Sequence, residues 1–323
     1  MSLRVFATMA VGSLVALSPV ACAPAEKDAT DTAAGAADTA AAAAASATRV
    51  TTIQGFSTPE SVMYDSTTDM LFVSNINGSP SDRDNNGFIS RVRADGTIDS
   101  LRFVAGGRSG VTLSAPKGMA LAGDTLWVTD IDAIRAFNRT TGAPITSVNL
   151  RPRGAVFLND MALGPDSAIY ITDTGIRFTA SGAEPVQPGR IFRVARDRSV
   201  TIAAQGDTLG GPNGIAWDRT NNRFVLGGFS TTDIFTWAPG EARPTKVATG
   251  PGGYDGLAVL NDGRVLISSW SDSTVSVVTG QSVARLVSGV DGPADFGIDT
   301  RRQRIAIPRF MANTVEIWTI PNQ

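Results

Sequence analysis

Short apolar runs separated by polar turns fill the chain from about residue 48 onwards. One phrase recurs six times: a residue of variable type, a small residue, an apolar residue and usually Ala. Its six copies are Glu60-Ser61-Val62, Lys117-Gly118-Met119, Asn159-Asp160-Met161, Asn213-Gly214-Ile215, Asp255-Gly256-Leu257 and Phe296-Gly297-Ile298. Successive copies begin 41 to 57 residues apart. Repeats of this length indicate an architecture built from similar structural units.

Each copy of the phrase opens a unit that contains further apolar runs. Runs of this length, bounded by polar turns, are typical of buried strands rather than helices. The second runs are 71–73, 126–128, 169–171, 224–226, 265–267 and 305–307, and the third runs are 88–92, 134–137, 191–194, 234–237, 275–278 and 315–318. The sequence therefore predicts an all-β fold with regularly repeated strands.

A fourth run completes five of the units but not the sixth. The fourth runs are 100–104, 145–150, 200–204, 245–248 and 283–287. The segment 48–53 precedes the first unit and has the right character to complete the sixth. Such a pairing closes a ring and removes the exposed edge of an open sheet. We therefore expect a six-bladed β-propeller over residues 48–323, with four-stranded blades and closure by strand 48–53.

Residues 1–22 have the pattern of an export signal, in which Arg4 precedes an apolar run and small residues follow. Cys22, the only cysteine, lies where a bacterial lipoprotein signal places its lipidated residue, although Pro19 stands where such signals prefer Leu. Ordinary cleavage around Cys22 is the alternative. Residues 23–47 are rich in Ala, Asp and Thr, which predicts a disordered linker. We expect an exported protein, periplasmic or on the cell surface, with membrane contact only through a lipid on Cys22.

The lipid anchor can be tested directly. Cells that express the wild-type chain in the presence of labelled palmitate should yield labelled protein, and the Cys22→Ser variant should not. An unlabelled wild-type chain would favour soluble export.

Composition restricts the chemistry further. The 323 residues include 28 basic and 30 acidic side chains, one Cys and no His. Without His there can be no Ser-His-Asp triad and no imidazole metal site. The nearly neutral charge argues against a nucleic-acid partner. The expected protein is a monomer whose chemistry uses carboxylates, amides, Lys, Arg or a metal bound by oxygen.

Equivalent positions of a propeller repeat lie at one height around the central channel. Aligned in this way, the first residues of the six phrases are Glu60, Lys117, Asn159, Asn213, Asp255 and Phe296. Four of the six carry side-chain oxygens, and two carboxylates with two amides suit a hard divalent cation. Ca²⁺ is the expected ion, with Mn²⁺, Mg²⁺ and Zn²⁺ as alternatives. Asn or Asp before Gly also forms turns, but Glu60 is not a turn former.

Four motifs around these positions resemble the regucalcin/gluconolactonase/luciferin-regenerating-enzyme family, also called the senescence marker protein family, and more distantly the paraoxonases. The motifs are Thr58–Val62, Leu158–Asp160, Pro212–Trp217 and Tyr254–Leu257. The resemblance implies a six-bladed propeller with one divalent cation in its channel. It also implies hydrolysis of lactones or related esters at the channel mouth. The ligands carried over are Glu60, Asn159, Asn213 and Asp255.

Two positions depart from these relatives. Phe157 stands where gluconolactonase-like members place an Arg that contacts the sugar, so a less hydrophilic substrate is expected. Lys117 stands where paraoxonases place a proposed catalytic His. With a lowered pKa it could act as a base, and as a cation it could stabilise an oxyanion. It could equally be an exposed lysine at the channel mouth.

The resulting mechanism is hydrolysis of a small lactone or ester by a metal-activated water. Asp255 is the candidate proton acceptor, Lys117 the second catalytic candidate, and Asp160 is expected to orient Asn159. The alternative is a non-catalytic, metal-stabilised propeller that binds a ligand or a protein. Two further patterns indicate structure rather than chemistry. Residues 82–93 match only half of a calcium loop, which predicts a polar hairpin loop, and the five Trp residues are expected to pack between strands.

Overall fold

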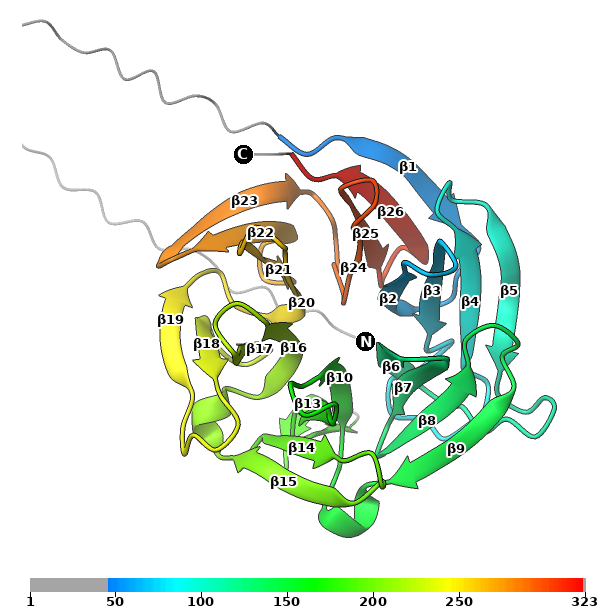
Figure 1. Cartoon of the computed structure of the whole chain (residues 1–323), viewed down its shortest axis with the longest axis horizontal. Coiled ribbons are helices and arrows are strands. Elements are labelled where there is room, and N and C mark those ends of the chain that lie inside the picture. Colours follow the sequence, from blue (N-terminus) through cyan, green and yellow to red (C-terminus); the bar gives the residue numbers. More distant parts are fainter. Residues whose placement is uncertain (1–45, 180, 322–323) are drawn as a thin grey trace, which may run out of the picture. The chain divides into compact units, whose positions relative to one another are not determined.

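The computed structural model describes residues 46–179 and 181–321, and the expected export signal, Cys22 and most of the linker lie outside them. Six four-stranded antiparallel sheets surround a central channel as the blades of a propeller (Figure 1). The all-β, six-bladed prediction is therefore confirmed. Within the described ranges, no helix has the length and apolar character needed to cross a membrane.

The first three blades are built in chain order from the innermost strand outwards. Blade 1 comprises β2 (Pro59–Asp65), β3 (Met70–Asn75), β4 (Phe88–Arg93) and β5 (Ile98–Ala105); blade 2 comprises β6 (Pro116–Ala122), β7 (Thr125–Asp130), β8 (Ala133–Asn138) and β9 (Pro144–Asn149); blade 3 comprises β10 (Leu158–Leu163), β11 (Ile169–Asp173), β14 (Arg190–Val194) and β15 (Val200–Gln205). The sequence prediction missed a hairpin inserted in blade 3, formed by β12 (Ile176–Thr179) and β13 (Gly182–Pro185).

The remaining blades follow the same order, and only the sixth takes a strand from elsewhere in the chain. Blade 4 comprises β16 (Pro212–Asp218), β17 (Arg223–Gly228), β18 (Asp233–Trp237) and β19 (Thr245–Thr249); blade 5 comprises β20 (Tyr254–Val259), β21 (Val265–Ser269), β22 (Thr274–Thr279) and β23 (Ser282–Ser288); blade 6 comprises β24 (Gly297–Asp299), β25 (Arg304–Arg309), β26 (Thr314–Thr319) and β1 (Arg49–Gln54). Two short 3₁₀ turns lie at Arg151–Arg153 and Asp207–Leu209.

The ring closes where β1 pairs with β26, as expected for segment 48–53. Ile53 lies opposite Val315, and Gln54 lies opposite Thr314. The Ile53 side chain is buried with Val62 and Val73 of blade 1. β1 therefore joins the last blade through its backbone and the first blade through its side chains.

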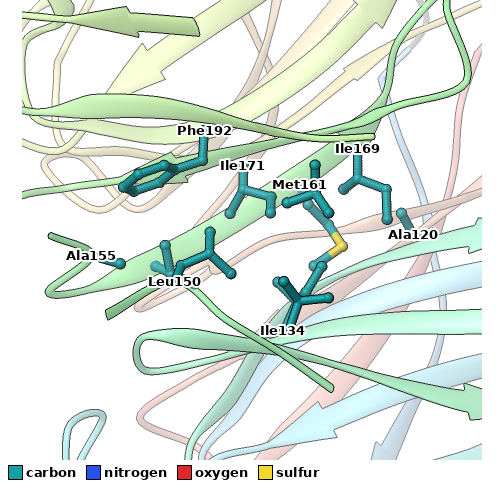
Figure 2. Close-up of a cluster of buried hydrophobic side chains, with 11 residues drawn as sticks. Ala120, Ile134, Leu150, Ala155, Met161, Ile169, Ile171 and Phe192 are labelled. Carbon is teal, nitrogen blue, oxygen red and sulfur yellow. The ribbon is translucent and has the colours of Figure 1, made fainter. Parts of the chain in front are cut away.

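Apolar clusters between neighbouring blades hold the ring together. In the cluster between blades 2 and 3, Ile134 and Met161 pack with Ile171 and Phe192, which are all but inaccessible to solvent (Figure 2). Side chains alternate between the two faces of a strand, and these residues lie on faces that pack against the neighbouring blade. The apolar positions that predicted the strands therefore also form the core.

The innermost strands carry the repeated phrase at an irregularity in their pairing. In blade 2, Pro116 pairs with Asp130 but Met119 pairs with Val128, so an extra residue bulges from the strand. The same shift occurs in blades 1, 3, 4 and 5. The repeated register thus brings the first residue of the phrase to the same place in five blades.

The expected register of the sixth blade is wrong. Pro293 forms an isolated bridge with Arg309, and Gly297 pairs with Ala306. Ala294 is therefore the residue in register with the first positions of the other phrases, and Phe296 lies two positions further along. The innermost strand of blade 6 is short, and the segment before it is paired through a single bridge. Phe296-Gly297-Ile298 therefore resembles the repeated phrase in sequence but occupies a different position along the channel.

Ring closure by β1 makes a clear prediction. Ile53→Ala should lower the free energy of unfolding by about 2–4 kcal/mol, because it removes a buried side chain between two blades. Val50→Ala is the matched control, since Val50 lies on the same strand and is 43% exposed, and it should change stability by less than about 0.5 kcal/mol. Urea unfolding measures both, and equal effects would contradict the packing role of β1.

Candidate active site

Five of the six predicted ring positions line one cavity at the end of the channel where the innermost strands begin. They are Glu60, Lys117, Asn159, Asn213 and Asp255, and the cavity has a volume of about 290 Å³. All five side chains are buried. Phe296 is absent from this cavity and lines the opposite end of the channel, in agreement with its shifted register.

Three of the oxygens predicted to bind a cation lack any partner. Glu60 Oε2, Asn213 Oδ1 and Asp255 Oδ1 are buried and make no hydrogen bond to a described residue. A buried polar atom without a partner costs about 1–3 kcal/mol. All three atoms accept hydrogen bonds or coordinate metals, and none can donate when the acids are ionised. Their convergence from three blades therefore fits a cation.

The other oxygens of the site are positioned by neighbouring side chains. Trp270 Nε1 donates to Asp255 Oδ2 at 2.8 Å, which leaves Oδ1 as the unpartnered atom. Asn159 Nδ2 donates to Thr174 Oγ1 at 3.3 Å. This contact corrects the expected role of Asp160, whose carboxylate accepts instead from the backbone N–H groups of Met161 and Ile215. Asp160 therefore fixes two innermost strands rather than Asn159.

Burial makes the acids of the site hard to ionise. The pKa of Asp255 rises to about 8, chiefly through burial and then through the nearby charge of Asp295. The pKa of Glu60 is raised well above its ordinary value by burial and by Asp255. A bound divalent cation would oppose both effects. No group of three or more carboxylates suited to a metal occurs within residues 46–179 and 181–321, so a cation here would depend on the two amides as well.

Lys117 is not an exposed lysine at the channel mouth, because its side chain is only 1% exposed. Its Nζ lies 4.3 Å from the centre of the Phe157 ring and 3.3 Å from the carbonyl oxygen of Ala115, to which it donates. Burial lowers the pKa of Lys117 to about 8. The ammonium group is thus held by an aromatic face and one carbonyl, beside Glu60 in the same cavity.

A second ring lies one residue further along the phrases. Its members are Ser61, Gly118, Asp160, Gly214, Gly256 and Asp295. The sequence does not reveal Asp295 as a member of this ring, because in the sequence it reads as a turn or strand-end residue. Ser61 Oγ donates to Asp295 Oδ2 at 2.5 Å. A Cβ atom on Gly118 would lie 2.5 Å from Cα of Asp160, so this position accepts no side chain.

The cavity mouth was also missed, although it follows a repeat of its own. The residue after the second strand of a blade lines the cavity in blades 1, 3, 4, 5 and 6. These residues are Ile76, Thr174, Phe229, Trp270 and Phe310, of which all but Thr174 are apolar or aromatic. In blade 3 the inserted hairpin contributes Phe178, whose ring centre lies 5.3 Å from that of Phe157. Trp270 therefore belongs to the cavity, whereas Trp237 is fully buried in packing as expected.

The buried acids predict how stability depends on pH in EDTA. Folded Asp255 keeps its proton up to about pH 8 and Asp295 up to about pH 7, whereas in the unfolded chain both ionise near their ordinary pKa of 3.8. The folded state binds more protons between these values, so the free energy of unfolding should fall as pH rises from about 4 to 8. Lys117 opposes this trend only above pH 8.

Urea unfolding at pH 5 and pH 8 measures this dependence. Asp255→Asn should reduce the loss of stability between the two pH values. Asp124→Asn is the control, because the Asp124 side chain is 81% exposed, and it should keep the wild-type dependence. Identical pH dependence in all three proteins would show that Asp255 ionises normally.

Comparison with known proteins agrees with this architecture. Residues 58–296 match the family described as SMP-30/Gluconolactonase/LRE-like region. Among curated proteins, no sequence matches the chain.

Solved structures share the fold at low sequence identity. A gluconolactonase from Xanthomonas campestris is 20% identical with a TM-score of 0.61, over 83% of this chain and 88% of its own. A luciferin-regenerating enzyme is 11% identical with a TM-score of 0.62, over 85% and 95%. A chain of a nidogen/laminin complex is 18% identical with a TM-score of 0.53, over 70% and 80%.

Proposed function

Because the chain belongs to the SMP-30/gluconolactonase/LRE-like family, we propose that it hydrolyses lactones or related esters with the help of one divalent cation. The observation that carries the proposal is the group of three unpartnered oxygens, on Glu60, Asn213 and Asp255, beneath an accessible cavity. A site of this kind has acceptors for a cation and room above them for a substrate.

Glu60, Asn159, Asn213 and Asp255 are the proposed cation ligands, and their all-oxygen character favours Ca²⁺. When bound, such a cation supplies Lewis-acid polarisation of the ester carbonyl and lowers the pKa of a coordinated water. The protein contributes the position of the ligands, since Trp270 and Thr174 fix two of the side chains.

Asp255 is the proposed proton acceptor for the attacking water. Its Oδ2 is held by Trp270 and its Oδ1 is without a partner. Oδ1 has two lone pairs, so one can serve the cation and the other can accept the proton. Lys117 is proposed to stabilise negative charge on the carbonyl oxygen, because its buried ammonium group faces the same cavity. Addition of water and cleavage of the acyl C–O bond convert a lactone into a hydroxy acid.

A non-catalytic binding module is the competing function. The shared fold of the nidogen/laminin chain does not decide between the two. The cavity favours hydrolysis, because a purely structural cation would not need open space of about 290 Å³ above its ligands.

Variants of the ligands test the proposal. Glu60→Gln and Asp255→Asn should lose bound metal, measured by mass spectrometry after dialysis against Ca²⁺, because each removes a carboxylate from the set. Both should also lose metal-stimulated turnover on a panel of lactones and aryl esters assayed with Ca²⁺, Mn²⁺ or Zn²⁺. Asp124→Asn is the matched control and should retain both properties.

The same panel tests Lys117. Lys117→Met should retain the metal but lower kcat by about 10²–10³, the usual effect of losing one oxyanion donor.

Unchanged metal content in Glu60→Gln and Asp255→Asn would refute the ligand assignment. Metal binding without turnover on any substrate would favour the binding module.

A further inference from the structure

The walls of the cavity differ in chemistry from its floor. The first residues of the repeated phrases form the floor and are polar in all five blades that contribute one. The residues that follow the second strands form the wall, and four of these five, Ile76, Phe229, Trp270 and Phe310, are apolar or aromatic; Thr174 of blade 3 is the exception. The propeller repeat therefore builds a polar ring and, nearer the entrance, a largely apolar one.

The aromatic side chains of the wall form two groups. Phe229, Trp270 and Phe310 make a continuous series across blades 4 to 6, with ring centres 5.8 Å and 5.3 Å apart. Phe157 and Phe178 form the second group, which comes from the start of blade 3 and its inserted hairpin. Both groups line the same cavity above the proposed cation ligands.

Among the described residues of the lining, Thr174 carries the one hydroxyl side chain, and its single donor is already used. It accepts from Asn159 and donates to the carbonyl oxygen of Pro212 at 2.9 Å. A substrate that carries several hydroxyls would lose water at this wall and find in its place only one free lone pair, on Thr174.

We propose that the cavity selects lactones that carry an apolar substituent, and that it rejects polyhydroxylated sugar lactones. The inference rests on the proposed hydrolase function, since the ester must reach the polar floor. The substituent then lies between the aromatic groups of the wall. Phe178 and Phe229 are 38% and 42% exposed, so the apolar surface extends to the entrance, where a longer substituent leaves the cavity.

The cavity volume sets the size of the favoured substituent. At about 30 Å³ for each water-sized group, the 290 Å³ cavity holds on the order of ten non-hydrogen atoms. A five-membered lactone ring with its carbonyl oxygen uses about six of them. We therefore expect the benefit of an alkyl substituent to grow up to about four carbons and then to level off.

The test compares γ-butyrolactone, its γ-alkyl derivatives with one to eight added carbons, and gluconolactone, all with the Ca²⁺-loaded protein. kcat/KM should rise about three- to fourfold for each methylene up to the plateau, because burying one CH₂ contributes about 0.8 kcal/mol. Gluconolactone should be the poorest substrate. Preferential turnover of gluconolactone, or no dependence on the alkyl chain, would overturn the inference and leave the hydrolase function standing.

Binding of γ-alkyl lactams, which are not cleaved as esters, separates the two proposals. Their Kd, measured by calorimetry, should show the same dependence on chain length even if no lactone is hydrolysed. Chain-length-dependent lactam binding without hydrolysis of any lactone would refute the hydrolase function and support the apolar cavity. Absence of any chain-length dependence in lactam binding would refute the cavity itself.

Two variants locate the effect in the wall. Phe178→Ala should reduce the preference for the four-carbon derivative over the unsubstituted lactone by about three- to tenfold, through loss of aromatic contact area. Leu101→Ala is the matched control, because Leu101 is also 38% exposed but lies on the outer strand of blade 1. It should leave the preference unchanged, and an equal effect of both variants would exclude a role of the wall.

Discussion

The close approach of the innermost strands around the channel is the constraint on which the site depends. A Cβ atom on Gly214 would lie 2.0 Å from the carbonyl oxygen of Asp255 in the next blade, so the neighbouring backbones touch at this level. With the backbones so close, side chains one position earlier are directed towards a common space. Five residues, each 42 to 57 positions from the next along the chain, thereby line one cavity.

This arrangement places four ionisable acids in a buried region of the protein. Burial raises the pKa of Glu60, Asp160, Asp255 and Asp295 together. The fold must tolerate that cost through packing elsewhere, between blades and at the closure by β1. Buried acids retained at such a cost are characteristic of functional sites. The proposed cation would remove much of the penalty, since the same unpartnered oxygens that destabilise the protein would become its ligands.

Much of this structure could be predicted from the sequence, because the repeat encodes it directly. The strand pattern, the closing strand and five of the six ring positions follow from apolar runs and a recurring phrase. The sixth register could not be read in this way, since Phe296-Gly297 imitates the phrase while a single bridge at Pro293 sets the true alignment. The burial of Lys117 could not be predicted from the sequence either, because the Phe157 ring that covers it belongs to another blade.

The residues of the cavity mouth were predictable in principle, because they also recur in every repeat unit concerned. They follow the second strand of a blade, whereas the residues of the floor are the first residues of the repeated phrase. The residue after the second strand is apolar in blades 1, 4, 5 and 6, and these strands end beside the start of the innermost ones. Floor and wall thus come from separate positions of one repeat. Phe178 lies on the inserted hairpin and packs against Phe157, so its substitution can alter which substrates enter without displacing Glu60 or Asp255. Phe229 and Phe310 pack against Trp270, which donates to Asp255, so substitutions there act on the floor as well. A propeller of this design could therefore keep the proposed cation site while its substrate selectivity changes, and in this chain the proposed selectivity for apolar groups would come from the aromatic wall.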